Sequence, residues 1–347
     1  MNAPAAPIDV RAVGRALSQV ENRGPEATAL LRAAYAHGRE PPVVGLAGPP
    51  GAGKSTLVDA LALHWAEAGE NVALLAVDPS SPYTGGALLG DRFRMDRASA
   101  HPRVYLRSLS SRGQQGGLCR ALPDLVMVLG QRGFARVIVE TVGSGQADTD
   151  VAAQCDVVAV LSVPGLGDQI QAAKSGLLEV GDLFVVNKAD LPGANVLAAQ
   201  LQAQIDLVYA GRPGVNPRGV AAAVVDGDAS IALRHGAASD EARHWVPPVL
   251  QVAARTGDGV AALVEAVDDF LAWQRASGRS IARRDGRLER HLMRLAGERW
   301  MADAHTARAL PPLAALVREG RLTPDAAAEA LLDALAWAWS DRRKESK

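Results

Sequence analysis

The stretch VVGLAGPPGAGKSTL, residues Val43–Leu57, decides the fold of this chain. Four of its residues match the phosphate-binding pattern G-x-x-x-x-G-K-[ST] without a gap: Gly48, Gly53, Lys54 and Ser55. The apolar run Val43–Ala47 predicts a buried strand, and Thr56–Ala68 carries apolar residues at helical spacing. The sequence therefore predicts a phosphate-binding loop between a strand and a helix.

The predicted loop has the residue types that binding a nucleoside triphosphate requires. Glycines let the backbone turn its N–H groups toward a phosphate, and the following helix directs its positive end to the same place. We expect Lys54 to reach the β- and γ-phosphates and the Ser55 hydroxyl to ligate Mg²⁺. A turn that merely packs a helix on a sheet is disfavoured by the complete pattern. The residues expected to contact the nucleotide are Gly48, Pro50, Gly51, Ala52, Gly53, Lys54, Ser55 and Thr56.

The length and the charge of the chain limit the classes of protein to which it can belong. With 347 residues, it is long enough for one large α/β core and a smaller helical region. Its 37 Lys and Arg residues nearly balance its 38 Asp and Glu residues. This balance gives no reason to expect a nucleic acid or an anionic membrane as a partner.

The cysteines and the first residues bear on metal content and compartment. Cys119 and Cys155 form no C-x-x-C pattern and no Cys/His cluster, so neither a zinc site nor a disulfide framework is expected. The sequence has no run of eighteen apolar residues, and MNAPAAPIDV lacks the basic start and apolar centre of a signal peptide. We therefore expect a cytoplasmic protein.

Strands and helices alternate along most of the chain. After the first strand, apolar runs predict strands at Val72–Val77, Val104–Leu106, Val137–Val139, Val157–Leu161, Leu183–Val186 and Val249–Val252. Helical patterns lie at Leu118–Gln131, Val196–Tyr209 and Val260–Trp273. Strands that are apolar throughout and separated by helices indicate a mostly parallel sheet with helices on both faces. The predicted fold class is α/β, a P-loop NTPase, in which ligands bind at the carboxyl ends of the strands.

Helical patterns at both ends predict regions outside this sheet. The expected boundaries are 1–40 for an N-terminal helical hairpin, 41–278 for the P-loop domain, 279–340 for C-terminal helices and 341–347 for a solvated tail. Within the C-terminal region, helices are predicted at Arg287–Arg308 and Leu313–Arg318. The stretch Ala210–Pro248, with several prolines and glycines, predicts a long irregular connection.

The residues NKAD, 187–190, follow a predicted strand and indicate which base is bound. The Asp190 carboxylate can accept hydrogen bonds from the N1–H and the exocyclic N2–H of guanine, a donor pair that adenine lacks. The Lys188 stem is expected to cover the base and Asn187 to fix the loop. Because a buried acceptor facing the unprotonated N1 of adenine is costly, the sequence favours GTP.

Three acidic residues near predicted strand ends indicate a magnesium site. Glu140 and Asp78 each follow a predicted strand, and Asp91 lies in a connecting loop. Any one of them is as consistent with a helix cap or an ion pair, but the three together, with Ser55, favour a shell of hard oxygen ligands. Gly143 offers a backbone N–H to a γ-phosphate without a side chain in the way. The residues expected to act in catalysis are Lys54, Glu140 and Asp91.

Six arginines lie between Asp91 and Gly113: Arg92, Arg94, Arg97, Arg103, Arg107 and Arg112. We expect most of them to be solvated and paired with Asp91 or Asp96. One is a candidate for reaching the phosphates when a partner binds, as cationic fingers do in other GTPases. The sequence does not distinguish which one.

Together these motifs resemble the MeaB/ArgK/MMAA family, GTPase chaperones of cobalamin-dependent acyl-CoA mutases, over about residues 10–340. The resemblance is carried by GPPGAGKST (Gly48–Thr56), AVDPSSPYTGGALLGDRFRM (Ala76–Met95), VETVGSGQAD (Val139–Asp148), VPGLGDQIQAAKSG (Val163–Gly176) and NKAD (Asn187–Asp190). The second and fourth of these stretches are far more specific than the general phosphate loop and NKAD.

The resemblance implies loops that respond to the γ-phosphate and to a partner enzyme. It implies switch segments at Asp78–Asp91 and Glu140–Gln146, and a third at Gly165–Gly176 in which Asp168 and Lys174 match positions that sense the mutase. It also implies a homodimer formed through the C-terminal helices. GTP binding and hydrolysis would gate delivery of adenosylcobalamin, the cofactor of the partner, and protect or repair the mutase. Hydrolysis is expected to be slow without that partner.

Two features depart from the family pattern. The loop after Val252 reads AARTG where many GTPases begin with serine, which removes a side-chain contact to guanine. Backbone donors remain at Ala253 and Ala254, which we expect to contact the base. The stretch Ala210–Pro248 is longer than the family pattern leads us to expect.

Three other functions are open on the sequence. A small-molecule kinase or ATPase would share the phosphate loop but would have no use for NKAD. A metal-insertion GTPase for nickel enzymes would need a metal-binding cluster, which two isolated cysteines and scattered histidines do not supply. A scaffold that holds a nucleotide structurally would not need the complete set of Lys54, Ser55, Asp78, Asp91 and Glu140.

Overall fold

A computed structural model describes seven parts of the chain, residues 8–78, 95–110, 120–141, 153–165, 180–209, 245–302 and 304–333. The chain forms two compact units, Met1–Arg284 and Asp285–Lys347. The first unit contains every strand that the structure describes and the expected nucleotide site, and the second unit contains C-terminal helices.

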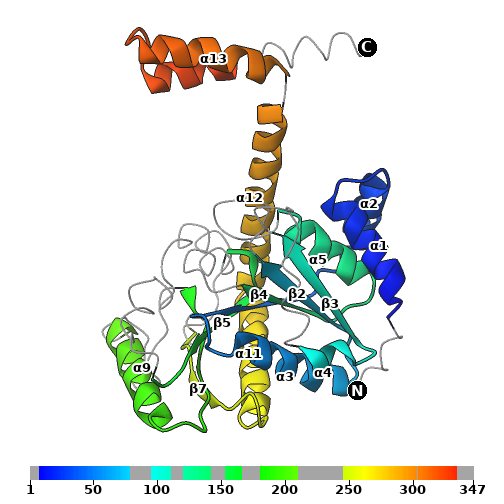
Figure 1. Cartoon of the computed structure of the whole chain (residues 1–347), viewed down its shortest axis with the longest axis vertical. Helices are drawn as coiled ribbons and strands as arrows, with labels where there is room; N and C mark the ends of the chain where they lie inside the picture. The colour runs from blue at the N-terminus through cyan, green and yellow to red at the C-terminus, as the bar shows by residue number, and fades with distance from the viewer. Residues whose placement is uncertain are drawn as a thin grey trace. The chain divides into compact units, whose positions relative to one another are not determined.

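The first unit is built on a seven-stranded sheet in which every strand pair is parallel (Figure 1). The strands are β1 (Val43–Ala47), β2 (Val72–Asp78), β3 (Val104–Ser110), β4 (Arg136–Thr141), β5 (Val157–Ser162), β6 (Leu183–Asn187) and β7 (Val249–Val252). Their order in the sheet is β3-β2-β4-β1-β5-β6-β7. The strand that leads into the phosphate loop, β1, therefore lies in the middle. The predicted α/β fold with a parallel sheet is confirmed.

Helices cover both faces of the sheet because its strands are apolar on both sides. The helices that the structure describes in the first unit are α1 (Val10–Glu21), α2 (Ala27–His37), α3 (Lys54–Glu67), α4 (Asp96–Ser99), α5 (Leu122–Gln131), α9 (Ala194–Tyr209) and α11 (Val260–Ala276). A further helix, α12 (Arg279–Ala302), begins in this unit and continues into the second. Residues of α1 and α5 share a buried cluster with Ala73 and Val137. Residues of α3 and α11 share another cluster with the next positions, Leu74 and Ile138. Successive strand residues point to opposite faces, so a strand buried on both sides is apolar at every position.

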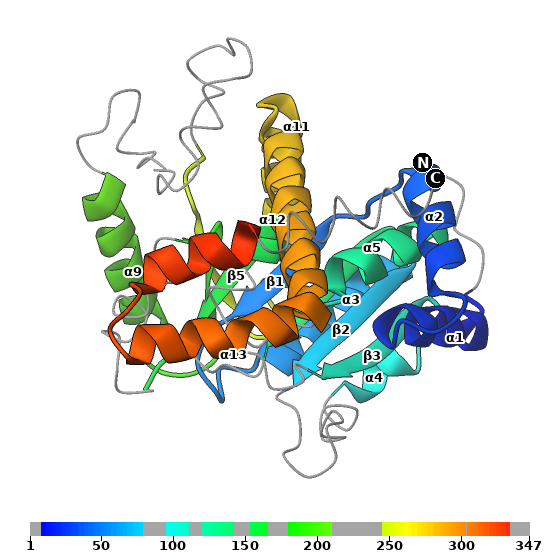
Figure 2. The same cartoon turned by 90° about the horizontal axis from the view of Figure 1, so that it is seen from above.

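The N-terminal hairpin of α1 and α2 packs against α5 (Figure 2). Val13 and Leu17 are buried on the apolar face of α1. Arg107 of β3 donates to the Glu21 carboxylate at 2.6 Å and to Ser18 Oγ at 3.2 Å, which ties α1 to the sheet. Most of the six arginines in this region were expected to be solvated, and Arg107 is an exception. Its guanidinium neutralises a carboxylate of the hairpin, a contact that sequence spacing does not reveal.

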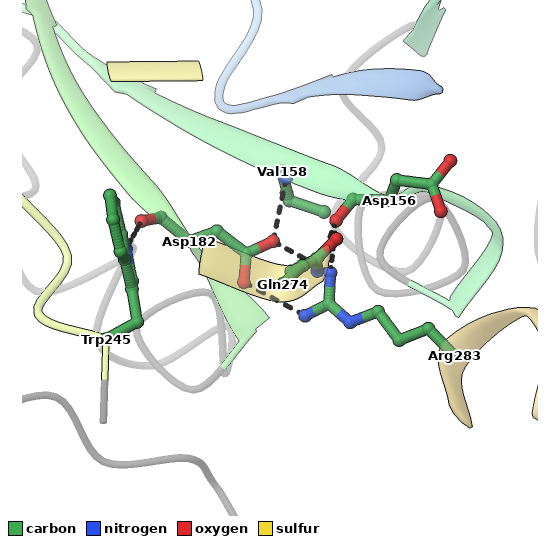
Figure 3. A network of polar contacts seen from close by, with 6 residues as sticks. All are labelled: Asp156, Val158, Asp182, Trp245, Gln274 and Arg283. Atoms are coloured by element: carbon green, nitrogen blue, oxygen red, sulfur yellow. Dashed lines mark hydrogen bonds and ion pairs between the residues drawn. The ribbon is translucent and has the colours of Figure 1, made fainter. Parts of the chain in front are cut away.

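Two aspartates accept backbone hydrogen bonds at the amino-terminal edge of the sheet. Asp156 directly precedes β5, and its Oδ2 accepts from the Val43 N–H of β1 at 2.8 Å. Asp182 directly precedes β6, and its Oδ2 accepts from the Val158 N–H of β5 at 2.9 Å (Figure 3). A buried backbone N–H without a partner is costly, so each carboxylate stabilises the start of a neighbouring strand.

Arg283, in the first turns of α12, completes this network (Figure 3). Its guanidinium donates to both carboxylate oxygens of Asp182, at 2.9 and 3.1 Å, and to the backbone oxygen of Asp156 at 2.6 Å. Gln274 of α11 donates to the same Asp156 oxygen at 2.8 Å, and the Trp245 indole N–H donates to the Asp182 carbonyl at 2.8 Å. Two helices are thereby joined to two strands at the edge opposite the carboxyl ends.

Burial raises the pKa of Asp182 above its ordinary value, although Arg283 and the Val158 N–H act in the opposite direction. A carboxyl group whose pKa is higher in the folded state than in the unfolded state reduces folding stability once the pH rises above the unfolded value. The ion pair with Arg283 limits that loss. The contribution of Arg283 should therefore be largest where Asp182 is ionised.

The second unit contains the rest of α12 and α13 (Ala304–Arg318), followed by further helix over residues 324–333. The predicted bounds Arg287–Arg308 and Leu313–Arg318 are wrong in two respects. First, α12 begins at Arg279 and not at Arg287. The prediction starts too late because the first turns of α12 carry arginines instead of an apolar repeat. Second, Pro311 and Pro312 lie inside α13 instead of preceding a new helix. In the part of the chain that the structure describes, no helix is long and apolar enough to cross a membrane.

Replacing Arg283 by Met should destabilise the protein, because it leaves the buried Asp182 carboxylate without its cationic partner. We expect the free energy of unfolding at neutral pH to fall by about 3 kcal/mol, measured by urea denaturation followed by circular dichroism. The loss should shrink as the pH falls through the raised pKa of Asp182, because protonation removes the charge. Arg284→Met is the matched control, since its 3.3 Å pair with Glu40 is partly exposed and worth at most about 1 kcal/mol. Equal losses in both variants, or a loss independent of pH, would contradict this account.

Candidate nucleotide-binding site

The candidate site lies at the carboxyl ends of the parallel strands in the first unit. Four pieces of chain meet there: the loop between β1 and α3, the end of β4, the loop after β6 and the loop after β7. Hydrogen bonds between side chains and backbone join these pieces. The strands are far apart in sequence, and the parallel sheet brings their carboxyl ends to the same edge.

Glycines shape the loop between β1 and α3, because two of them are closely approached by other groups. Gly48 has a φ of 140°, and a Cβ there would lie 2.6 Å from the backbone oxygen of Leu161 in β5. Gly53 has a φ of 82°, and a Cβ there would lie 2.5 Å from Asn187 Nδ2. Side chains are excluded at both positions, so the loop backbone can pass close to the strand ends.

Lys54, the first residue of α3, is buried, and its ammonium group binds the loop itself. Its Nζ donates to the backbone oxygen of Gly48 at 2.7 Å and to that of Pro49 at 3.2 Å. These bonds hold the cation inside the curve of the loop. A bound triphosphate would find the positive charge already in place, with carbonyl contacts exchanged for phosphate oxygens.

Ser55 and Glu140 bring two hard oxygen donors together. The Ser55 hydroxyl donates to Glu140 Oε1 at 2.6 Å, and the Glu140 side chain is buried. Glu140 lies opposite Leu46 in the ladder between β4 and β1, so the central strand pair fixes its position. A hydroxyl and a carboxylate at this distance are the ligand types that Mg²⁺ prefers, and the donor set fits that ion.

Asn187, at the end of β6, connects the phosphate loop to the loop after β7. Its Nδ2 donates to the backbone oxygen of Ala52 at 2.8 Å, and its Oδ1 accepts from the Ala254 N–H at 3.2 Å. Asn187 is 2 % exposed, so both bonds are shielded from competing water. A single buried amide therefore sets the distance between two loops that the sequence assigns to opposite ends of a nucleotide.

The loop after β6 turns sharply and presents Asp190 to solvent. Lys188 has a φ of 57°, which is uncommon for a residue other than glycine, and the Ala189 N–H donates to the Val252 oxygen at 3.1 Å. Asp190 Oδ2 lies 3.6 Å from a guanidinium nitrogen of Arg255, whose side chain is 80 % exposed. An ion pair this exposed contributes little, so the carboxylate remains available to donors on a base.

The structure brings part of the predicted residue set to this edge of the sheet. The predicted residues found there are Gly48, Pro50, Gly51, Ala52, Gly53, Lys54, Ser55, Thr56, Glu140, Asn187, Lys188, Asp190, Ala253 and Ala254. The last residue of β2, Asp78, also lies at this edge. The predicted residues outside the described parts of the chain are Asp91, Gly143, Asp168 and Lys174.

Two groups at the site were not expected from the sequence. The backbone oxygen of Leu161 lies against Gly48, and the Arg255 guanidinium lies beside Asp190. A backbone oxygen carries no sequence signal, so the first contact depends on the strand order. The second has a weak signal, because Arg255 is the third residue of the predicted base loop AARTG.

Replacing Gly53 by Ala should weaken nucleotide binding more than replacing Gly51 by Ala. Both residues have a left-handed φ, 82° and 77°, so both variants strain the backbone by about 1 kcal/mol. At Gly53 the added methyl group would also displace Asn187 from its bonds to both loops, whereas nothing lies within 4 Å of a Cβ at Gly51. We expect GTP to bind roughly tenfold more weakly to Gly53→Ala in calorimetry, with a smaller loss for Gly51→Ala. Equal losses would show that Asn187 moves aside freely.

Comparison with known proteins identifies the family of this chain. A protein of Pyrococcus horikoshii that is named as a GTPase is 37 % identical over 281 residues, which cover 81 % of this chain and 80 % of that one. GTPase ArgK of Escherichia coli is 40 % identical over 182 residues, 51 % of this chain and 55 % of ArgK. The crystal structure of a LAO/AO transport system kinase shares the fold, with a TM-score of 0.62 at 24 % identity over 94 % of both chains.

The family model described as methylmalonyl-CoA mutase-associated GTPase MeaB matches residues 13–309 of this chain. The match includes all seven strands and the four pieces of chain that form the candidate site. This chain therefore belongs to the MeaB family of GTPases.

Proposed function

We propose that this GTPase uses Mg²⁺ and GTP to serve an adenosylcobalamin-dependent acyl-CoA mutase as a chaperone. The observation that carries the nucleotide part of this proposal is the bridge made by Asn187. It holds the loop of Lys54 and Ser55 at a fixed distance from the loop of Asp190. One end of that site suits phosphates and the other suits a guanine base.

Guanine recognition is assigned to the loops after β6 and β7. The Asp190 carboxylate would accept the N1–H and N2–H of the base, and the Lys188 stem would lie over the ring. The Ala253 N–H donates to the Asp258 backbone oxygen and the Ala254 N–H to Asn187 Oδ1, so these two residues would shape the wall of the base site rather than donate to the guanine oxygen. ATP should bind poorly, because its N1 has no hydrogen to offer Asp190.

The residues that would hold Mg²⁺ are Ser55, Asp78, Asp91 and Glu140. The contact between Ser55 and Glu140 supports this assignment, since it places two suitable oxygens together. When bound, Mg²⁺ would supply positive charge to the β- and γ-phosphate oxygens.

Hydrolysis itself would depend on positioning by the chain. Lys54 would leave its contacts with Gly48 and Pro49 to stabilise charge on the transferred phosphoryl group, together with the backbone N–H groups of the loop. Gly143 would donate a backbone N–H to the γ-phosphate. Glu140 and Asp91 would orient the attacking water. Without a further cation supplied by a partner, this arrangement should work slowly.

The partner is proposed to be the mutase that the family description names. Adenosylcobalamin would be bound by that mutase. The segment containing Asp168 and Lys174 would sense the mutase. GTP binding would order the switch segments Asp78–Asp91 and Glu140–Gln146, which would relax after hydrolysis, so that the mutase selects one of two states. We place the protein in the cytoplasm and propose neither a nucleic acid nor a membrane as a partner.

A homodimer through the C-terminal helices is part of the proposal. Leu288 and Leu292 lie one turn apart on the same face of α12 and are 44 % and 55 % exposed. Two neighbouring leucines on one helix face are the kind of surface that a second helix covers. We assign residues 1–40 to an N-terminal extension, 41–278 to the GTPase domain and 279–340 to this dimer-forming region.

Replacing Asp190 by Asn should move base preference from guanine toward xanthine. The asparagine amide would set its N–H₂ group against the N2–H₂ of guanine, whereas xanthine has an oxygen at that position. We expect GTP affinity to fall by about 100-fold and XTP affinity to rise, measured by calorimetry. Asp206→Asn on α9 is the control for loss of one carboxylate. Tight binding of ATP by the unaltered protein would refute the GTP assignment.

The cognate mutase should raise the rate of GTP hydrolysis. We expect slow phosphate release by the GTPase alone and an increase of at least about tenfold with the mutase, because a partner completes the catalytic set. Lys54→Ala should abolish nucleotide binding and give no release with or without the mutase. If the mutase binds but leaves the rate unchanged, the chaperone part of the proposal fails while the GTPase part stands.

A further inference from the structure

Helix α3 makes two contacts one turn apart on the face that begins at Ser55. Residues four apart lie above one another on a helix, so Ser55 and Asp59 point to the same side. Ser55 donates to Glu140 of β4. Asp59 is 7 % exposed, and its Oδ1 accepts from the backbone N–H of Ala98 at 2.7 Å. Near the amino end of α3, this helix face therefore contacts β4, and one turn further along α3 it contacts α4.

The contact with Asp59 matters because α4 is too short to form alone. It has four residues, Asp96–Ser99, and a helix of one turn has no stability of its own in water. Its flanking residue Met95 and its own Ala98 are 1 % and 0 % exposed. Both belong to the apolar cluster that includes Leu57 and Leu61 of α3. Apolar contact and the Asp59 bond together hold α4 against α3.

Ala98 lies in the first turn of α4, where backbone N–H groups have no partner within the helix. The residue before this helix, Met95, makes no side-chain cap for it. Asp59 supplies the missing acceptor from a position 39 residues earlier in the chain. A carboxylate makes a stronger hydrogen bond to a backbone N–H than a neutral acceptor does.

The position of α4 in the topology connects it with the nucleotide. The chain leaves the sheet at Asp78, the end of β2, and returns through α4 before entering β3 at Val104. The switch segment Asp78–Asp91, which the family resemblance implies to respond to the γ-phosphate, lies a few residues before α4 in the chain. The chain that follows this segment runs through α4, which Asp59 attaches to the helix whose first residues, Lys54 and Ser55, would bind the phosphates and metal.

We infer that Asp59 is a positioning residue for discrimination between GTP and GDP. Its carboxylate holds α4 on the helix that follows the phosphate loop, so that the bound nucleotide affects the positions of both helices. The inference rests on the proposed function, in which the γ-phosphate is sensed on the α4 side of the site. Asp59 touches neither nucleotide nor metal. It acts through the Ala98 N–H and the placement of α4.

An ordinary stabilising cap makes a different prediction from a positioning residue. If Asp59 only stabilises the fold, its loss lowers the unfolding midpoint and changes GTP and GDP affinities by the same factor. If it positions α4 for the γ-phosphate, its loss weakens binding of a GTP analogue while GDP binding is nearly unchanged. The ratio of the two affinities therefore separates the roles.

The test compares Asp59→Ala and Asp59→Asn with the unaltered protein by calorimetry in Mg²⁺, using GDP and a non-hydrolysable GTP analogue. We expect Asp59→Ala to bind the analogue about fivefold more weakly, with GDP affinity changed less than about twofold. Asn keeps an acceptor without the charge, so Asp59→Asn should recover part of the loss. Glu67→Gln, on the exposed end of the same helix, is the matched control and should change neither affinity.

Amide hydrogen exchange of residues 95–99 gives a second readout. In the unaltered protein, exchange there should be slower with the GTP analogue than with GDP, and Asp59→Ala should remove the difference. Equal changes in both affinities, or equal exchange with both nucleotides in the unaltered protein, would overturn the inference. Failure of the unaltered protein to prefer GTP over ATP would instead overturn the proposed function, so the two failures are distinguishable.

Discussion

The side-chain amide of Asn187 makes the two hydrogen bonds on which the candidate site depends. Its nitrogen donates to the phosphate loop and its oxygen accepts from the loop after β7, so one planar group fixes the spacing of two loops. The bonds are shielded by burial, and the close approach of the amide requires glycine at position 53. Because β1 and β6 are separated by β5 in the sheet, the strands alone do not set this distance. The Asn187 amide, at the end of β6, reaches past β5 to the phosphate loop that follows β1.

At the opposite edge of the sheet, buried backbone groups are also satisfied by side-chain hydrogen bonds, here from different residues. Backbone N–H groups at the starts of β1 and β5 need acceptors, and Asp156 and Asp182 provide them. Burying these carboxylates would be costly without a cation, and Arg283 of α12 supplies one. The amino-terminal edge thus carries a network in which Asp156, Asp182 and Arg283 are each bonded to other groups of the chain. The carboxyl edge keeps Asp190 accessible, which is what a binding site needs.

Helix α3 relates the two sides of the proposed mechanism. It begins with the residues that would hold phosphate and metal, reaches β4 through Ser55, and holds α4 through Asp59. A hydrogen bond from a rigid helix to a one-turn helix carries displacement better than apolar contact alone, because it has a preferred length and direction. The start of the phosphate-loop helix, the central strand β4 and α4 are thereby attached to one element.

Much of the fold and part of the site could be predicted, and the contacts that join them could not. The phosphate loop, its flanking strand and helix, and the alternation of apolar strands are local patterns, fixed by spacing along the chain. The apolar pattern predicts too short a β3, because Arg107 interrupts the apolar run, and only the packed hairpin shows why an arginine is stable there. The start of α12 was missed for the same reason, since Arg283 and its neighbours have no apolar repeat.

Short-range spacing and residue chemistry suffice to predict the α/β fold class, the phosphate loop and a guanine nucleotide. The tertiary structure decided which distant groups meet: Asn187 with Ala254, 67 residues apart, Arg283 with Asp182, 101 residues apart, and Asp59 with Ala98. Each of these pairs joins a side chain to a partner on another element, and its formation depends on strand order and helix packing. Hydrogen bonds act over about 3 Å, so a pattern along one dimension cannot specify them until the sheet has placed both partners.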